Sequence, residues 1–302
     1  MDNYDEIANY LNNNIDSYLD LVSQELIKYF SPDYKNEIIS RIDSTNFIFF
    51  IKHFSSDCYD SIHRRGRIVK ENYQTLRKEF INLKKGINNN DSYSPIIYNY
   101  KNEVASTLGS SQTIYDNTST TIIFNNHYRE IYIPLYLQSD EALIHEIIHS
   151  ITGSVSINGE IHVGLYNNKK SETRSIEEVI TQYNAKKIYK RVKNKISLVD
   201  KYYPFDNVIC LYDDYINVIK NFYLKYRREI NYSRFTSDKD FIIKLFGKHN
   251  YFLLLQLIDE YYWKDNYFNG NYYNKRISKT INDIDSYARK RLKNWHSVSF
   301  VI

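Results

Sequence analysis

The chain of 302 residues is long enough to bury a sizeable core and to form two subdomains. Hydrophobic residues make up 42% and charged residues 25%, a balance that excludes a disordered chain and is typical of globular proteins. No stretch approaches the ~20 apolar residues of a membrane span, and a formal net charge of +4 is too small to indicate nucleic acid as an obligatory partner.

The start of the chain predicts no signal peptide. It reads MDNYDEIANYLNNN, which is acidic and polar where a secretory signal has a basic and then an apolar run. The two cysteines, Cys58 and Cys210, are too few for a disulfide framework and fit a reducing compartment. We therefore expect a cytoplasmic location for the chain as it is written.

The first hundred residues are predicted to be helical. Residues 4–30 carry apolar side chains at helical spacing and stop before Pro32. Residues 59–91 have the pattern of a second long helix that ends in glycine and a run of asparagines.

The segment 86–119 is the best candidate for a linker, because it is rich in Asn, Ser, Thr and Gly. From this we predict a helical N-terminal region, residues 1–110, and a catalytic region, residues 111–302, that ends in further helices. The segment at 253–258 is expected to lie in a fully buried helix.

Residues 120–137 are predicted to form two strands around Asn125 and Asn126, which favour a turn. Pro134 cannot donate a hydrogen bond to a neighbouring strand. Either the second strand therefore lies at a sheet edge, or the proline ends the strand. An unpaired edge would let an extended peptide bind by strand addition.

The segment after these strands, DEALIHEIIHSITG, predicts a helix. Ser139 precedes it as an N-cap, and Gly153 stands where a C-terminal cap belongs. Isoleucines at positions i, i+3, i+4 and i+7 form an apolar stripe. His145 and His149 share a face that this stripe leaves free, and Glu146 is adjacent to the first histidine.

This HExxH pattern has the spacing that zinc hydrolysis requires. Two imidazoles one helical turn apart can bind one ion, and the adjacent carboxylate can reach a water molecule that the ion activates. We therefore predict Zn²⁺ as the cofactor, His145 and His149 as ligands, and Glu146 as the general base. The alternative is a chance HExxH on a solvated helix face.

A catalytic zinc needs a third protein ligand and one open position. The metzincin pattern would place Gly at position 152 and His or Asp at position 155. The chain has Thr152 and Val155 there, which excludes that class.

A second amphipathic helix, predicted over residues 175–192, offers a carboxylate instead. Glu177 and Glu178 both lie near its start, and one of them could reach the metal. Ser175 and Glu178 also spell a capping box, in which the glutamate only bonds the helix backbone.

The text DEALIHEIIHSITG, followed by SIEEVITQY, resembles the gluzincin branch of zinc metallopeptidases, and in particular the light chains of clostridial neurotoxins. In that family the second glutamate of the Glu-Glu pair binds zinc. The resemblance therefore implies His145, His149 and Glu178 as metal ligands and Glu146 as the base. It also implies an α+β, mostly helical zincin-like fold with a small sheet beside the HExxH helix.

The resemblance covers about 55 of the 302 residues, and the first 120 residues show no match. Gln182 stands where thermolysin-like gluzincins carry an aspartate that orients a histidine ligand. The protein substrate of the toxins is therefore not carried over. Tyr166, His162 and the segment YARKR, 287–291, are candidates for stabilising an oxyanion, and this role stays unassigned.

Together these patterns predict a zinc-dependent metalloendopeptidase that hydrolyses peptide bonds of a protein substrate. The alternative is a non-catalytic helical binding protein with a vestigial metal site. Its basic faces, such as residues 63–67 and 289–293, would bind an acidic partner. A toxin or effector of this kind would act in the cytoplasm, or in a host cell that it reaches by a route the sequence does not show.

Overall fold

The computed structural model describes residues 4–50, 60–63, 66–69, 114–116, 121–124, 129–134, 139–155, 161–167, 174–201, 213–263 and 266–295. The chain divides into two compact units. The first comprises residues 1–161 and 184–209, and the second comprises residues 162–183 and 210–302. Helix α7 (Arg174–Val192) is one unbroken helix that passes from the second unit into the first.

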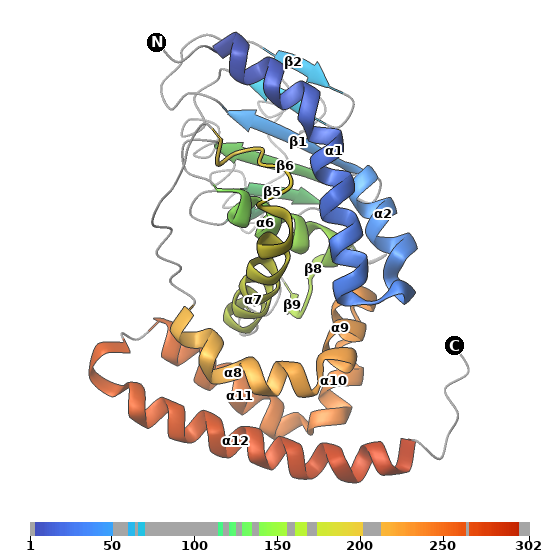
Figure 1. Ribbon diagram of the computed structural model, residues 1–302. Helices are drawn as coiled ribbons and strands as arrows, with labels where there is room; N and C mark the ends of the chain where they lie inside the picture. The colour runs from blue at the N-terminus through green and yellow to red at the C-terminus, as the bar shows by residue number, and fades with distance from the viewer. Residues whose placement is uncertain are drawn as a thin grey trace, which may run out of the picture. The chain divides into compact units, whose positions relative to one another are not determined.

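The first unit begins with α1 (Tyr4–Phe30), the short 3-10 helix η1 (Pro32–Tyr34) and α2 (Lys35–Asp43) (Figure 1). Ile15, Leu19 and Val22 on α1 are buried, as their helical spacing predicts. The helix predicted over residues 4–30 is confirmed, and it ends where Pro32 opens the 3-10 helix.

The helical prediction for the first hundred residues is wrong at three described segments that follow α2. Residues Thr45–Phe50 form strand β1, and the helix expected from residue 59 is replaced at its start by β2 (Asp60–His63) and β3 (Gly66–Val69). Pairing with strands distant in sequence overrides local helical spacing, since Phe47 and Phe49 are buried on the sheet. Residues 70–91 of that expected helix lie outside the described residues.

These strands belong to a mixed six-stranded sheet with the order β2-β3-β1-β6-β5-β4. The other members are β4 (Ile114–Asp116), β5 (Thr121–Phe124) and β6 (Arg129–Pro134). The predicted hairpin around Asn125 is confirmed as the antiparallel pair β5 and β6. Strand β4 falls inside the segment expected to be a linker, so that expectation is wrong at residues 114–116.

Pro134 is the last described residue of β6 and lies opposite Phe50 of β1. Strand β6 pairs in parallel with β1 on one side and antiparallel with β5 on the other. The expectation of an edge strand is therefore wrong. The second possibility, that the proline lies at a strand end, stays a prediction, because residues 135–138 lie outside the described residues. Because both sides of β6 are occupied, strand addition cannot take place there.

Helix α6 (Asp140–Thr152) carries the HExxH segment and is followed by β7 (Gly153–Val155). The Ser139 side chain accepts a hydrogen bond of 3.1 Å from the backbone N–H of Ala142, which confirms the predicted N-cap. Gly153 occupies the C-cap position, as predicted, in an extended conformation with φ −79°.

The second unit contains the hairpin of β8 (Ile161–Val163) and β9 (Tyr166–Asn167), and the N-terminal part of α7. Its other helices are α8 (Asp213–Lys225), α9 (Arg227–Thr236), α10 (Lys239–Phe246), α11 (Lys248–Trp263) and α12 (Asn266–Trp295). Gly247, with φ 80°, separates α10 from α11 in a conformation that favours glycine.

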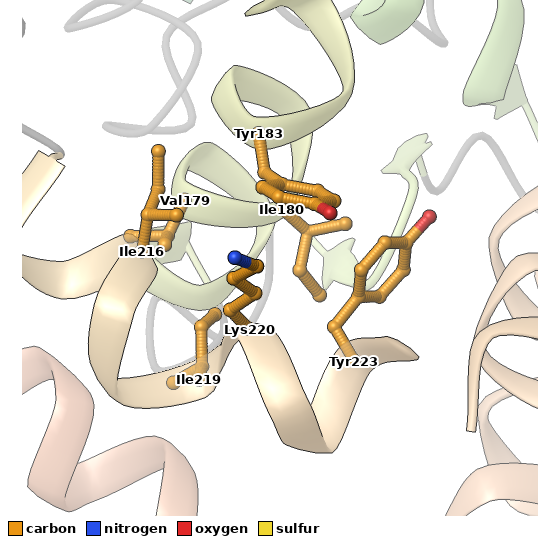
Figure 2. Close-up of a pocket in the computed structure, with 7 residues that line it drawn as sticks. All are labelled: Val179, Ile180, Tyr183, Ile216, Ile219, Lys220 and Tyr223. Atoms are coloured by element: carbon orange, nitrogen blue, oxygen red, sulfur yellow. The ribbon is translucent and has the colours of Figure 1, made fainter. Parts of the chain in front are cut away.

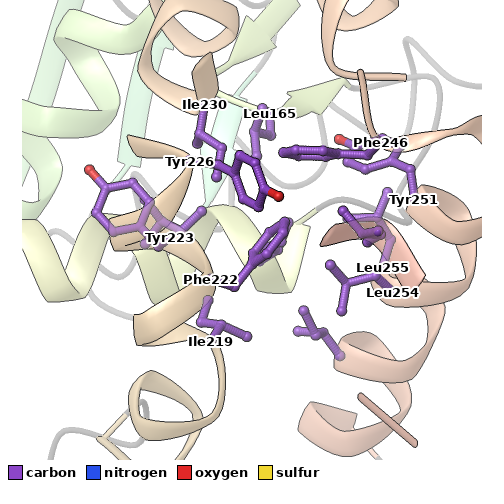
Figure 3. Packing of buried hydrophobic residues seen from close by; sticks show 14 of the residues in the cluster. Leu165, Ile219, Phe222, Tyr223, Tyr226, Ile230, Phe246, Tyr251, Leu254 and Leu255 are labelled. Carbon is purple, nitrogen blue, oxygen red and sulfur yellow. The ribbon is translucent and has the colours of Figure 1, made fainter. Parts of the chain in front are cut away.

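A large apolar cluster from these helices forms the core of the second unit (Figure 3). Phe222, Tyr226 and Phe246 pack with ring centroids 5.0 to 5.4 Å apart. Leu254, Leu255, Leu257 and Ile258 of α11 are buried, as predicted, but Leu253 is only partly buried and Gln256 is exposed, so the expectation of a fully buried helix is wrong. No helix in the described part of the chain is long and apolar enough to cross a membrane. The described fold is mostly helical and also contains the six-stranded sheet and the hairpin of β8 and β9, which is consistent with the α+β class.

Candidate metal centre

The HExxH residues lie on a helix that is buried on nearly all sides. His145 and Glu146 are each 3% exposed, and His149 is fully buried. The isoleucine stripe alone does not explain this, because a helix with one apolar stripe leaves its opposite face in water. The HExxH residues therefore do not lie on a solvated helix face.

The two histidine rings converge. Their Nε2 atoms lie 2.9 Å apart, and the ring centroids are separated by 4.6 Å with nearly perpendicular planes. Two imidazole nitrogens this close together can bind one ion.

Glu178 completes the group. One ligand atom from each of His145, His149 and Glu178 lies within 4.8 Å of the others, and all three residues are buried. Burial raises the pKa of the Glu178 carboxyl to about 8, since a charged carboxylate is poorly solvated there. A divalent cation would supply the positive charge that such a carboxylate lacks. The donor set of two imidazoles and one carboxylate therefore fits a metal ion.

The capping alternative for Glu178 is wrong. Helix α7 begins at Arg174, so Ser175 lies inside the helix rather than before it. The Ser175 N–H donates to Asp259 at 3.3 Å and not to Glu178. Within the described residues, the Ser175 hydroxyl has no hydrogen-bond partner.

Glu177, the other glutamate considered, has a different environment. Its carboxylate forms a fully buried ion pair with Arg234 of α9 and also accepts the backbone N–H of Leu165 at 2.9 Å. The sequence reasoning did not identify Arg234. It stands 57 residues after Glu177, and nothing in the local text of α9 marks it as buried.

Helix α6 is held by polar contacts at both ends. At its first residue, the Asp140 carboxylate accepts hydrogen bonds from the hydroxyl of Ser197 at 2.7 Å and the N–H of Leu198 at 3.1 Å. At its last turn, the Arg41 guanidinium donates to the carbonyl oxygen of Ile151 at 2.5 Å. A cation at a helix C-terminus and an anion at its N-terminus both complement the helix dipole.

The candidates for oxyanion stabilisation are not assigned by the geometry. His162 is half-buried on β8, and the side chain of Tyr166 lies outside the described residues. In the YARKR segment, Arg291 donates to the Tyr287 hydroxyl at 2.8 Å on the exposed surface of α12. That pair is an ordinary i,i+4 contact of a helix surface.

A shallow apolar pocket, too small to hold a water molecule, lies between α7 and α8 (Figure 2). Its lining includes Val179, Tyr183, Ile219 and Tyr223, with the aliphatic stem of Lys220 alongside. Residues 179 and 183 stand about 100° and 140° around the helix from position 178. The pocket therefore lies on a different face of α7 from Glu178.

Comparison with known proteins gives no relative for this chain. No protein-family model, curated protein or solved structure matches it. The function must therefore be inferred from the side chains of the candidate metal centre.

Proposed function

We propose that this protein is a zinc-dependent metalloendopeptidase of the gluzincin type, acting on a protein or peptide substrate. The observation that carries the proposal is the buried group of His145, His149 and Glu178, with Glu146 on the same helix as the two histidines. The local resemblance to gluzincins, and to clostridial neurotoxin light chains among them, supports the same reading.

His145, His149 and Glu178 would hold the ion. Two histidines and one glutamate are a ligand set of catalytic zinc sites in peptidases, and three protein ligands leave one coordination position open. When bound, zinc supplies a Lewis acid that brings the pKa of a water molecule toward ~7.

Glu146 acts as the general base. It follows His145 directly in the chain, and its side chain is 3% exposed, so bulk water does not compete for its carboxylate. The carboxylate accepts a proton from the attacking water as the water oxygen bonds to the peptide carbonyl carbon. The same group can then deliver that proton to the departing amine nitrogen as the C–N bond breaks.

Metal analysis and a peptidase assay on the purified chain test the proposal together. We expect one zinc per chain and cleavage of a peptide library, both of which a chelator removes. A folded chain that binds no zinc would contradict the metal site. Zinc without hydrolysis of any peptide would instead favour a binding protein with a vestigial site.

A further inference from the structure

The buried ion pair next to the candidate metal ligand is unusually well connected. The side chains of Arg234 and Glu177 are both 0% exposed. Arg234 Nε lies 3.1 Å from both carboxylate oxygens of Glu177, and its Nη2 donates to Oε1 at 2.5 Å. Thr181, one turn further along α7, donates to the same Oε1 at 3.0 Å and accepts from Arg234 at 2.8 Å.

The turn between β8 and β9 closes over this carboxylate. Leu165 donates its backbone N–H to Oε2 of Glu177 at 2.9 Å. Gly164, just before it, has φ 56°, and a Cβ atom added there would lie 2.2 Å from the carboxyl group. Only glycine fits that position, so the backbone of the turn and the guanidinium of Arg234 enclose Glu177 from two sides.

Such a pair is poor evidence for stability, because removing two charges from water offsets much of their attraction. It does fix geometry. The guanidinium is a planar fork whose donors engage both carboxylate oxygens in one orientation. Since Glu177 and Thr181 are both held, the rotation of the first turns of α7 about its axis is set.

Successive helical residues point about 100° apart. With Glu177 held by Arg234 of α9, the next residue is directed elsewhere, and Glu178 joins His145 and His149. We propose that the buried Arg234–Glu177 pair positions the metal ligand, selecting Glu178 over the adjacent Glu177 by fixing the rotation of α7. Arg234 and Glu177 are thus positioning residues, and this role rests on the proposed metal site.

The experiment replaces Arg234 by lysine, which keeps the charge and loses the planar fork. Zinc affinity is measured by competition with a chromophoric chelator, and the coordination geometry is read from the visible spectrum of the Co²⁺-substituted protein. We expect zinc affinity to fall about 10- to 100-fold, as it does when the groups that orient metal ligands are removed. The Co²⁺ spectrum should change as well, while far-UV circular dichroism of the metal-free protein stays native.

Ile284→Ala is the matched control. Ile284 is fully buried on α12 in the apolar cluster of the same unit, so its truncation destabilises the unit without altering the α7 pair. We expect it to lower the melting temperature and to keep zinc affinity and the Co²⁺ spectrum of the wild type. If Ile284→Ala weakens zinc binding as much as Arg234→Lys does, the effect is general destabilisation and the positioning role is overturned.

If Arg234→Lys fails to fold, the double variant Glu177→Met with Arg234→Met takes its place, because it leaves neither charge buried alone. The expected result is again a folded chain with weakened zinc binding and an altered Co²⁺ spectrum. Wild-type zinc affinity in a folded variant overturns the positioning role and leaves the peptidase proposal intact. A wild-type chain that binds neither ion overturns the metal site, and the positioning role with it.

Discussion

The carboxylate of Asp140 accepts a hydrogen bond of 2.9 Å from the backbone N–H of Val199, linking the first residue of α6 to the segment that follows α7. Asp200, which follows Val199, also contacts both helices. Its carboxylate accepts a hydrogen bond of 2.9 Å from the backbone N–H of Asp140 and another of 2.9 Å from the hydroxyl of Tyr189. The two helices that carry the metal group are therefore joined within the first unit, at the start of α6 and the end of α7.

Asp140→Asn should reduce the free energy of unfolding by about 1–3 kcal/mol, because an amide nitrogen would replace one oxygen that faces buried donors. Denaturant unfolding of the metal-free protein measures this loss. Glu141→Gln is the matched control, since it removes the same charge from the same helix turn. Equal losses in the two variants would mean that only the charge at the helix end matters and that the contacts to residues 197–199 contribute nothing.

Glu146→Gln should preserve metal binding and the fold and lower the peptidase rate at least ~10²-fold, because it removes the group that accepts the proton. Zinc content and turnover are measured on the same preparation. In contrast to Glu146→Gln, the variants His145→Ala and His149→Ala should each lose the bound metal. A Glu146→Gln variant that keeps both zinc and full activity would assign the base to another residue.

Glu178→Gln should weaken zinc binding at least ~10-fold, because it replaces a charged ligand. The metal-free variant should nevertheless be at least as stable as the wild type at pH 7. The pKa of Glu178 is raised to about 8, so its carboxyl is mostly protonated in the folded chain and ionised in the unfolded chain at that pH. This difference favours unfolding as the pH rises, and glutamine removes it. Unchanged zinc affinity would show that Glu178 is not a ligand.

Local sequence was sufficient to predict α6 and α7. The signals for α6 all depend on residues a few positions apart: the cap at Ser139, the isoleucine stripe and the spacing of His145 and His149. The helix lies between the two predicted caps, over Asp140–Thr152. The hairpin of β5 and β6 was predicted for the same reason.

Strand β1 was missed because its structure depends on a distant partner, whereas β2 pairs with the nearby β3 and was missed because its residues were assigned to a long helix. The run at Thr45–Phe50 becomes a strand by pairing with β6, more than eighty residues later in the chain. The helical pattern alone left the choice between Glu177 and Glu178 open, and the family resemblance was what implied Glu178. The two glutamates are adjacent on one helix. The structure separates them, because Glu177 contacts Arg234, Thr181 and the N–H of Leu165, while Glu178 lies beside the two histidines.

The ion pair between Glu177 and Arg234 determines what the Glu177→Gln variant should do. The substitution leaves the guanidinium of Arg234 buried without its carboxylate partner. Removing one partner of a buried ion pair lowers the free energy of unfolding by about 3–5 kcal/mol. Thermal unfolding should therefore show a large loss in Glu177→Gln and none in Glu178→Gln, although the two positions are neighbours. Comparable stability of both variants would contradict the buried pair.

The stability of the second unit should depend on pH through Asp285 of α12. Burial raises the pKa of this carboxyl, but hydrogen bonds from Lys225 and Tyr226 outweigh burial and leave the pKa below its ordinary value. A carboxyl with a lowered pKa in the folded chain contributes stability above its unfolded pKa, and the contribution is lost as the pH falls through the folded value.

Asp285→Asn should therefore lower the free energy of unfolding by about 1–2 kcal/mol at pH 7, and by progressively less as the pH falls below 4. Asp283→Asn, which removes the same charge at an exposed position of the same helix, is the control. Urea unfolding of the three proteins between pH 3 and pH 7 measures the difference, and parallel curves for the two variants would refute the role of the Lys225 and Tyr226 contacts.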